Sequence, residues 1–242
     1  MVCEFCGREI KFRRYSWTCG LTIPVPCECE GAKRRREEED RREWREERDR
    51  VLRKAIANAK IPPRFRLFPE YGDGSSSYYI FGEQGRGKTE MACGMIRNYL
   101  NQGIEEVAHN RFFATRSAKF VDVPELLMYM RKTYDVRGSS EADLMESYAG
   151  VGLLCLDDLG KGQMTPWAIE RIYTLLNLRY KRNKPIIITS QYDGEALVNR
   201  LAEKDDRETA LAIWSRIEGM CKIGQVKGPD WRKKWKESSD SR

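Results

Sequence analysis

One short run of this chain has the residue types and spacing that bind a nucleotide phosphate. Residues 82–89 read Gly-Glu-Gln-Gly-Arg-Gly-Lys-Thr, which is the complete G-x-x-x-x-G-K-[ST] pattern. Its glycines permit a tight turn and a close approach of the backbone, the lysine reaches the outer phosphates, and the threonine hydroxyl can ligate Mg²⁺. The predicted nucleotide-binding residues are Gly82, Gly85, Gly87, Lys88 and Thr89. The alternative is a flexible surface loop that matches the pattern by chance.

The residues on either side of this loop have the structure that its mechanism requires. Tyr78–Phe81 is a short strand-like run, and Thr89 to about Asn101 is typical of a helix. A glycine-rich turn between a strand and a helix directs several backbone N–H groups to one spot at the positive end of the helix dipole. We therefore expect ATP to bind there.

A pair of carboxylates follows a second strand-like run. The apolar residues 153–156 are followed directly by Asp157 and Asp158. On a strand beside the phosphate loop, Asp157 would hold Mg²⁺, directly or through water, and Asp158 would polarise the attacking water as general base. The alternative is an acidic exit from a strand.

Further polar residues qualify only as candidates. Gln191 follows the apolar run 186–188, where a polar side chain can orient water, although strands commonly end in polar residues. A γ-phosphate needs positive charge in the transition state, and Arg216 and Arg232 are candidates for it. A surface arginine is the default interpretation of either one.

The first 30 residues hold five of the eight cysteines. A CxxC pair and a CxC pair about twenty residues apart predict a tetrahedral Zn²⁺ site of four thiolates, and the metal would supply folding energy that so short a segment lacks. The predicted ligands are Cys3, Cys6, Cys27 and Cys29. Cys19 is the odd thiol and can replace one of the second pair. The single histidine, His109, lies far from this cluster along the chain.

The elements that position these residues are predicted from periodicity. Residues 33–50 are charged apart from Trp44 and predict a solvated linker helix, which Ile61-Pro62-Pro63 ends. From Arg64 onward, strands alternate with helices, which indicates a doubly wound parallel α/β sheet. The expected domains are a zinc-binding head (1–32), a helical linker (33–60) and an ATPase domain (61–242).

Composition restricts the class of protein further. The chain has 242 residues, of which 40% are hydrophobic and 33% charged, with a net charge of +7. Its apolar runs are too short to span a membrane, and no signal peptide precedes Cys3, so we expect a cytoplasmic protein without a membrane partner. The positive charge suggests an anionic partner such as nucleic acid, although solubility alone can explain it.

Taken together, these motifs resemble one family. The chain is similar to AAA+ ATPases of the bacterial and phage helicase-loader type (DnaC/DnaI-like) over about residues 58–235, and also to the IstB-like transposition helper ATPases. Besides the phosphate loop, the resemblance rests on these short motifs: Ile61-Pro62-Pro63-Arg64-Phe65, Val123-Pro124-Glu125-Leu126-Leu127, Leu156-Asp157-Asp158-Leu159-Gly160, Thr189-Ser190-Gln191, Ser215-Arg216-Ile217 and Asp230-Trp231-Arg232.

The resemblance implies an ATP hydrolase with further site roles. It implies Gln191 as sensor 1, Arg216 as an arginine finger that acts on a neighbouring subunit, and Arg232 as sensor 2. The sequence departs from the family at Gln191, where the family usually has Asn. It also has Asp158 at a position where many AAA+ proteins have Glu. Such a loader binds a hexameric replicative helicase through its N-terminal head, self-associates, and places the ring on single-stranded DNA during replication.

Three other functions remain open at this point. A transposition helper ATPase would remodel DNA for a transposase, but we expect no zinc head in it. A small-molecule kinase would need an acceptor pocket, and a zinc protein with a dead nucleotide site would not need Lys88, Thr89 and Asp157. For DNA contact, two segments rich in basic and aromatic residues are candidates, Arg111–Lys119 and Tyr129–Tyr134. Their aromatic residues can equally belong to the core.

Overall fold

The computed structural model of the chain describes residues 1–14, 21–67, 69–133, 140–203 and 207–230. Contacts divide the chain into two compact units. The first comprises Met1–Val51 with Glu106–Phe113, and the second comprises Leu52–Glu105 with Ala114–Arg242. None of the described helices combines the length and the apolar character that a membrane crossing requires.

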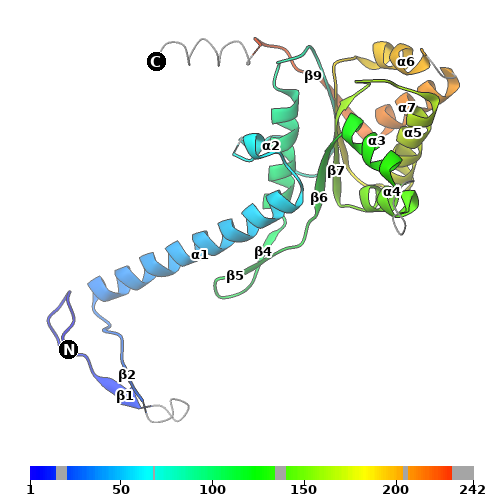
Figure 1. The fold of residues 1–242 in the computed structure, drawn as a ribbon. Helices are drawn as coiled ribbons and strands as arrows, with labels where there is room; N and C mark the ends of the chain where they lie inside the picture. Colours follow the sequence, from blue (N-terminus) through cyan, green and yellow to red (C-terminus); the bar gives the residue numbers. More distant parts are fainter. Residues whose placement is uncertain (15–20, 68, 134–139, 204–206, 231–242) are drawn as a thin grey trace. The chain divides into compact units, whose positions relative to one another are not determined.

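A parallel sheet organises the second unit, and in the described residues it has five strands (Figure 1). In spatial order they are β6 (Ala118–Asp122), β7 (Leu153–Leu159), β8 (Ile186–Ser190), β3 (Ser77–Phe81) and β9 (Cys221–Gln225). Each neighbouring pair is parallel. The predicted doubly wound α/β sheet is therefore confirmed.

Helices cover both faces of this sheet, because its strands are apolar on both sides. Along β7, Leu154 and Leu156 belong to one core, and Leu153 and Cys155 belong to the other, as the two-residue repeat of a strand requires. Figure 1 shows α2 on one side of the sheet and α3, α5 and α7 on the other. The helices of the unit are α2 (Lys88–Asn101), α3 (Val123–Lys132), α4 (Glu141–Ala149), α5 (Pro166–Lys181), α6 (Gly194–Ala202) and α7 (Arg207–Met220), with a single 3-10 turn, η2 (Pro63–Phe65).

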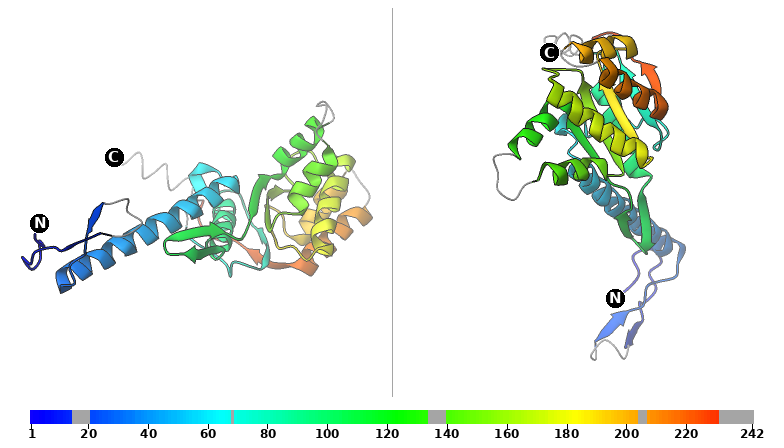
Figure 2. Two further views of the ribbon diagram at one scale, coloured as in Figure 1. Left: turned by 90° about the horizontal axis from the view of Figure 1, so that it is seen from below. Right: turned by 90° about the vertical axis from the view of Figure 1, so that its right-hand side faces the viewer.

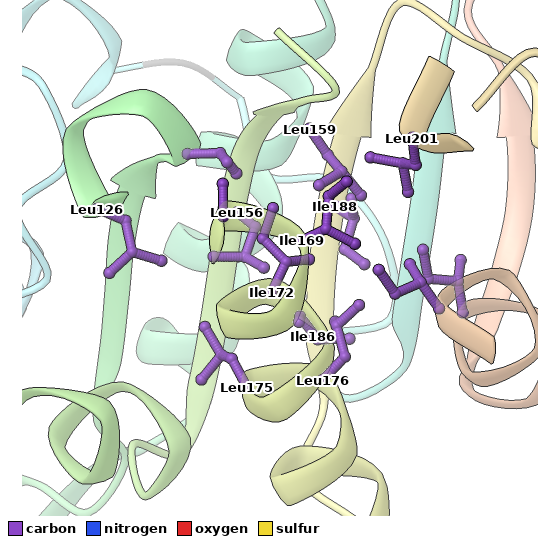
Figure 3. Close-up of a cluster of buried hydrophobic side chains, with 14 of the residues drawn as sticks. Leu126, Leu156, Leu159, Ile169, Ile172, Leu175, Leu176, Ile186, Ile188 and Leu201 are labelled. Carbon is purple, nitrogen blue, oxygen red and sulfur yellow. The ribbon is translucent and has the colours of Figure 1, made fainter. Parts of the chain in front are cut away.

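The larger core lies under α5. One side of this helix carries Ile169, Ile172, Leu175 and Leu176, spaced three or four residues apart, and all four are buried against β7 and β8 (Figure 3). Thr165 caps the helix by accepting a hydrogen bond from the Ala168 N–H at 3.3 Å. Helices α5 and α7 pack side by side on this face (Figure 2).

The first unit contains short strands and a long helix. Strands β1 (Phe12–Arg14) and β2 (Thr22–Pro24) pair antiparallel. The predicted linker helix is present as α1 (Glu30–Asn58), which belongs to this unit as far as Val51. Strands β4 (Ile104–Ala108) and β5 (Arg111–Ala114) pair with each other around a two-residue loop.

The pairing of β4 with β5 was not predicted from the sequence, and it changes the interpretation of the basic-aromatic segment 111–119. The Phe112 ring packs edge-on against Trp44 of α1, with the centroids 5.1 Å apart, and the Trp44 indole N–H donates to Glu106 at 2.9 Å. In the second unit, Arg116 donates to the Tyr99 carbonyl and Lys119 to the Ser147 carbonyl. The segment is thus largely engaged with its own chain.

Candidate functional site

The glycine-rich loop joins β3 to α2, as the sequence predicts. Gly82 has φ +149°, and a Cβ there would lie 2.5 Å from the carbonyl oxygen of Val226, the residue after β9, so a side chain would not fit without moving that backbone. Gly87 precedes α2 with a left-handed φ of +89°, which glycine adopts without strain. The loop therefore curves directly into the first turn of α2, where free N–H groups and the helix dipole favour an anion.

Lys88 lies inside this curve. Its side chain is buried, and its ammonium donates to the carbonyls of Gly82 at 2.7 Å and Glu83 at 2.8 Å. A buried ammonium needs such partners, because desolvation of an isolated charge costs several kcal/mol. The loop thus fixes a positive charge beside the N–H groups at the start of α2.

Asp157 is buried at the carboxyl end of β7, next to the loop. The Thr89 hydroxyl lies 3.0 Å from both of its carboxylate oxygens, and the Thr189 hydroxyl donates to its Oδ1 at 2.6 Å. Burial raises the pKa of Asp157 to about 6, against the opposing effect of the Thr189 and Thr89 hydroxyls, and the charge of Asp158 adds to the rise.

This end of the sheet offers hard oxygen ligands. One carboxylate oxygen each from Asp122, Asp157 and Asp158 lies within 4.8 Å of the other two, and Thr89 adds a hydroxyl beside Asp157. Carboxylate and hydroxyl oxygens are the donors that Mg²⁺ takes, and a cation would offset the mutual repulsion of the acids. The donor set therefore fits Mg²⁺ at Thr89 and Asp157.

Asp158 adopts a backbone conformation that is unusual for a residue with a side chain. Its φ is +59°, and its N–H donates to the Thr189 hydroxyl at 2.9 Å. Its carboxylate forms an ion pair with Lys161, whose Nζ lies 2.5 Å from Oδ2. Thr189 thus bridges Asp157 and Asp158 from the neighbouring strand β8.

Gln191 lies just beyond the end of β8 and beside the glycine-rich loop. Its Oε1 accepts a hydrogen bond from Gln84 at 3.2 Å, and its Nε2 donates to the Tyr192 hydroxyl at 3.1 Å. The side chain is therefore fixed from both ends at the edge of the loop.

These groups line a cavity of about 620 Å³. The glycine-rich loop contributes Gly85, Gly87, Lys88 and Thr89, and the strand ends contribute Asp158 and Gln191. The lining also includes Arg64, Phe65, Pro69, Tyr71, Met91 and Val226. A cavity of this size, with an apolar wall and a polar phosphate-binding end, suits a nucleotide.

Neither of the two predicted arginines, Arg216 and Arg232, is among the described residues that line this cavity. Arg216 lies on α7, where it donates to Asn177 at 3.0 Å, to the Ala212 carbonyl and to the Tyr173 hydroxyl, and its guanidinium lies over the Tyr173 ring. It is absent from the described lining of the cavity. Arg232 lies outside the described residues.

Sequence reasoning missed three residues of this site: Asp122, Lys161 and Thr189. A signal for Thr189 existed in the sequence, since a hydroxyl at the end of one buried strand can reach a carboxylate at the end of its neighbour. Recognising it requires the pairing of β7 with β8, which the sequence does not state. Asp122 and Lys161 had a weaker signal, since Asp122 is the last residue of β6 and Lys161 comes two residues after β7.

The four predicted cysteine ligands come together in the first unit. The sulfurs of Cys3, Cys6, Cys27 and Cys29 all lie within 4.8 Å of one another, with Cys3–Cys29 at 3.7 Å and Cys6–Cys27 at 3.5 Å. A tetrahedral zinc with Zn–S bonds of about 2.3 Å places its sulfurs about 3.8 Å apart, so the spacing fits this metal. Hydrogen bonds from the backbone N–H groups of Phe5 and Cys6 lower the pKa of Cys3 to about 6. For Cys6, a backbone hydrogen bond with Arg8 is outweighed by desolvation and the three neighbouring thiols, which raise the pKa to about 11.

The other cysteines are separate from this cluster. Cys93, Cys155 and Cys221 are buried in the second unit, and burial raises the pKa of each thiol. They therefore behave as packing residues. Cys19 lies outside the described residues.

Comparison with known proteins identifies relatives of this chain. A family model described as IstB-like ATP binding protein matches residues 70–239. The uncharacterized protein YqaM of Bacillus subtilis (strain 168) is 26% identical over 162 residues, which are 62% of this chain and 42% of YqaM. The replicative helicase loader DnaC of Escherichia coli (strain K12) is 23% identical over 152 residues, which are 62% of this chain and 57% of DnaC. The match thus spans about half the length of these curated relatives.

A solved structure has the same fold. The crystal structure of DnaI aligns with a TM-score of 0.52 at 25% identity, covering 74% of this chain and 83% of that chain. The family match covers most of the second unit, including the glycine-rich loop and both strand ends of the site. The family match therefore indicates an ATP-binding domain. The chain belongs to the IstB-like ATP-binding proteins, as a DnaC/DnaI-like member of the AAA+ ATPases.

Proposed function

We propose that this protein is an ATP-dependent helicase loader, which binds a replicative ring helicase and places it on single-stranded DNA. The observation that carries the proposal is the four-cysteine cluster of zinc-like spacing in a unit of its own, added to an ATPase of the DnaC/DnaI type. In a small head the metal can supply folding energy that a larger core would otherwise provide. The side chains at its surface are then available to bind another protein. Exposed apolar side chains on this head, such as Phe5 and Phe12, support a protein partner.

The roles of the residues in ATP hydrolysis follow from their chemistry. When bound, Mg²⁺ would neutralise charge on the β- and γ-phosphates and would be held by Thr89 and Asp157. Lys88 would bind the same phosphates. Asp158 would take a proton from the attacking water, and Gln191, fixed by Gln84, would orient that water.

We further propose that Arg216 acts on the nucleotide of a neighbouring subunit. It lies outside the cavity of its own chain, and an arginine finger supplied by a neighbour requires such a position. Its present bonds to Asn177 and Tyr173 would have to break in the assembly. A head-to-tail contact of this kind builds rings or spirals. Arg232 is proposed as the sensor-2 arginine on the family pattern alone.

We assign the head to residues 1–32, the linker to 33–60 and the ATPase domain to 61–242.

We propose that single-stranded DNA binds to the surface of α3 that carries Arg131 and Lys132. Cationic side chains suit the phosphate backbone, and the exposed Met128 beside them suits the bases. The last residue of the predicted segment Tyr129–Tyr134 lies outside the described residues.

A replicative helicase and its DNA are cytoplasmic in a bacterium, so we expect the protein to act there, in a host or a phage-infected cell.

One observation favours a second function. The matching family model is described as IstB-like, and a helper ATPase for a transposase would share the whole nucleotide site. The two functions differ in the partner that the protein binds.

Co-purification of full-length protein with the replicative helicase of a candidate host, with and without ATP, tests the proposal. We expect a stable complex that is lost when zinc is removed by a chelator. Binding to a transposase in place of the helicase would favour the helper function. Failure to bind any replicative helicase at micromolar concentration would contradict the loader function and leave the ATPase assignment intact.

A further inference from the structure

Lys161 lies in the short loop that follows β7, between two hollows of the second unit. It lines the nucleotide cavity, and it also lines a second hollow of about 310 Å³ beside α3. In the structure its ammonium lies 2.5 Å from Oδ2 of Asp158. One side chain therefore connects the proposed general base to a separate surface.

Hydrogen bonds hold the backbone of this loop in place, whereas the Lys161 side chain is held at its ammonium by Asp158. Gly160 and Gly162 have left-handed φ values of +90° and +80°, and both of their carbonyls accept hydrogen bonds from Arg200 of α6. The Lys161 side chain is 55% exposed. Its ammonium can thus exchange partners by rotation about side-chain bonds alone, without movement of the loop.

The hollow beside α3 has the chemistry of a phosphate site. Lys161, Arg131 and Lys132 all line it, and no carboxylate occurs in the part of its lining that the structure describes. The side chain of Met128, 44% exposed, adds an apolar surface. Three cations beside an apolar surface complement a single strand of nucleic acid, whose phosphates are anionic and whose bases have apolar faces.

We propose that Lys161 is a positioning residue that restrains Asp158, and that it releases Asp158 when a phosphate of single-stranded DNA binds in the hollow beside α3. The inference rests on the proposed function of Asp158 as general base and of α3 as a DNA-binding surface. On this proposal, Lys161 makes the rate of ATP hydrolysis depend on single-stranded DNA.

The restraint follows from how a carboxylate acts as a base. Asp158 has to accept the proton of a water molecule as the water oxygen bonds to the γ-phosphorus and the bond to the β–γ bridging oxygen breaks, so that ADP leaves with that electron pair. While Lys161 donates to Oδ2, the ion pair fixes the orientation of the carboxylate and occupies one of its acceptor positions. A DNA phosphate offers the ammonium an alternative anion of the same kind, and the freed oxygen can then accept from water.

The test measures steady-state ATP hydrolysis by the full-length protein with and without oligothymidine. Lys161→Met keeps the length of the side chain and removes the charge. We expect its basal kcat to rise by about three- to tenfold, with little further stimulation by oligothymidine and with KM for ATP within about twofold of the parent. Lys161→Arg should restore both the low basal rate and the stimulation, because a guanidinium can also pair with a carboxylate.

A matched control is Lys181→Met, which removes an exposed lysine at the end of α5, outside both hollows as described. We expect it to hydrolyse ATP like the parent, with and without oligothymidine. Thermal unfolding of each variant, followed by circular dichroism, verifies that all are folded.

Several outcomes would overturn the proposal. They are a basal kcat of Lys161→Met at or below that of the parent, full stimulation by oligothymidine in that variant, and stimulation of the parent by an acidic polypeptide but not by DNA. Asp158→Asn separates these from failure of the proposed function. Undiminished turnover in Asp158→Asn would refute the general base itself, whereas loss of turnover there with a normal response in Lys161→Met would refute only the role of Lys161.

Discussion

The hydroxyl of Thr189 lies 2.6 Å from Oδ1 of Asp157 and accepts the backbone N–H of Asp158 at 2.9 Å. A single side chain at the end of β8 thus orients the proposed Mg²⁺ ligand and supports the left-handed backbone of the proposed base on β7. Its methyl group takes no part in either hydrogen bond, so replacing the hydroxyl by a second methyl group removes both bonds and keeps the shape of the side chain.

Thr189→Val should reduce kcat for ATP hydrolysis by about 10- to 100-fold, as loss of a hydrogen bond to a metal ligand commonly does. It should also lower stability by about 1–3 kcal/mol, because the buried N–H of Asp158 loses its acceptor. Steady-state hydrolysis and urea unfolding measure the two effects. Thr189→Ser retains the hydroxyl and should stay within a few-fold of the parent; equal rates in the valine variant would contradict the assigned role.

Lys88→Ala should reduce ATP hydrolysis by about 100-fold or more, since it removes the positive charge that the glycine-rich loop fixes beside the phosphates. Binding of a fluorescent ATP analogue should weaken as well. Lys181→Met is the matched control, because that lysine lies on the exposed end of α5. Undiminished hydrolysis by purified Lys88→Ala protein would refute the nucleotide site.

Arg216→Ala should bind ATP like the parent and lose turnover, provided that the arginine completes the site of a neighbour. Mixing this variant with Lys88→Ala protein should restore part of the activity, because some interfaces then combine an intact loop with an intact arginine. The measurement is ATP hydrolysis across mixing ratios, with assembly followed by light scattering. No recovery from two variants that still assemble would show that Arg216 does not act on a neighbouring subunit.

Zinc should be present at about one ion per chain in protein purified without chelators, bound by Cys3, Cys6, Cys27 and Cys29. Elemental analysis measures it. Removal of the metal should unfold the head, because the cluster supplies much of its folding free energy, and should leave ATP binding by the second unit intact. Cys93→Ala serves as a control that should retain the metal. Metal-free protein with a protease-resistant head would contradict this prediction.

Arg179→Met should destabilise the second unit by about 3–5 kcal/mol, because several buried carbonyls lose their donor and each unsatisfied group costs about 1–3 kcal/mol. The Arg179 side chain is fully buried on α5 and donates to five carbonyls: Tyr148, Ala149, Val151, Gly152 and Pro185. Burial lowers the pKa of its guanidinium to about 10. Urea unfolding is the measurement, and Arg182→Met, which removes an exposed arginine three residues away, is the control. Equal stability of the two variants would show that these carbonyls find other partners.

The sequence alone predicted most elements of the second unit and most of the motifs that meet in its candidate site. The strand before the glycine-rich loop and the helix after it were predicted to within one residue, because β3 and α2 are fixed by local periodicity and by the glycines between them. The apolar run ending at Asp157 likewise predicted a buried strand, since a strand covered on both faces is apolar throughout. The spacing of the cysteine pairs predicted the cluster that the first unit forms.

Tertiary structure decided which of these residues meet. The bridge from Thr189 to Asp157 exists because β7 pairs with β8, and strand order is a long-range property that no local pattern encodes. The strands β4 and β5 were missed because the residues that stabilise them include Trp44 of α1, about sixty positions earlier in the chain. The ion pair of Lys161 with Asp158 accompanies a left-handed turn at Asp158. Side chains disfavour this conformation, and here the Thr189 hydroxyl on the neighbouring strand β8 accepts the Asp158 N–H.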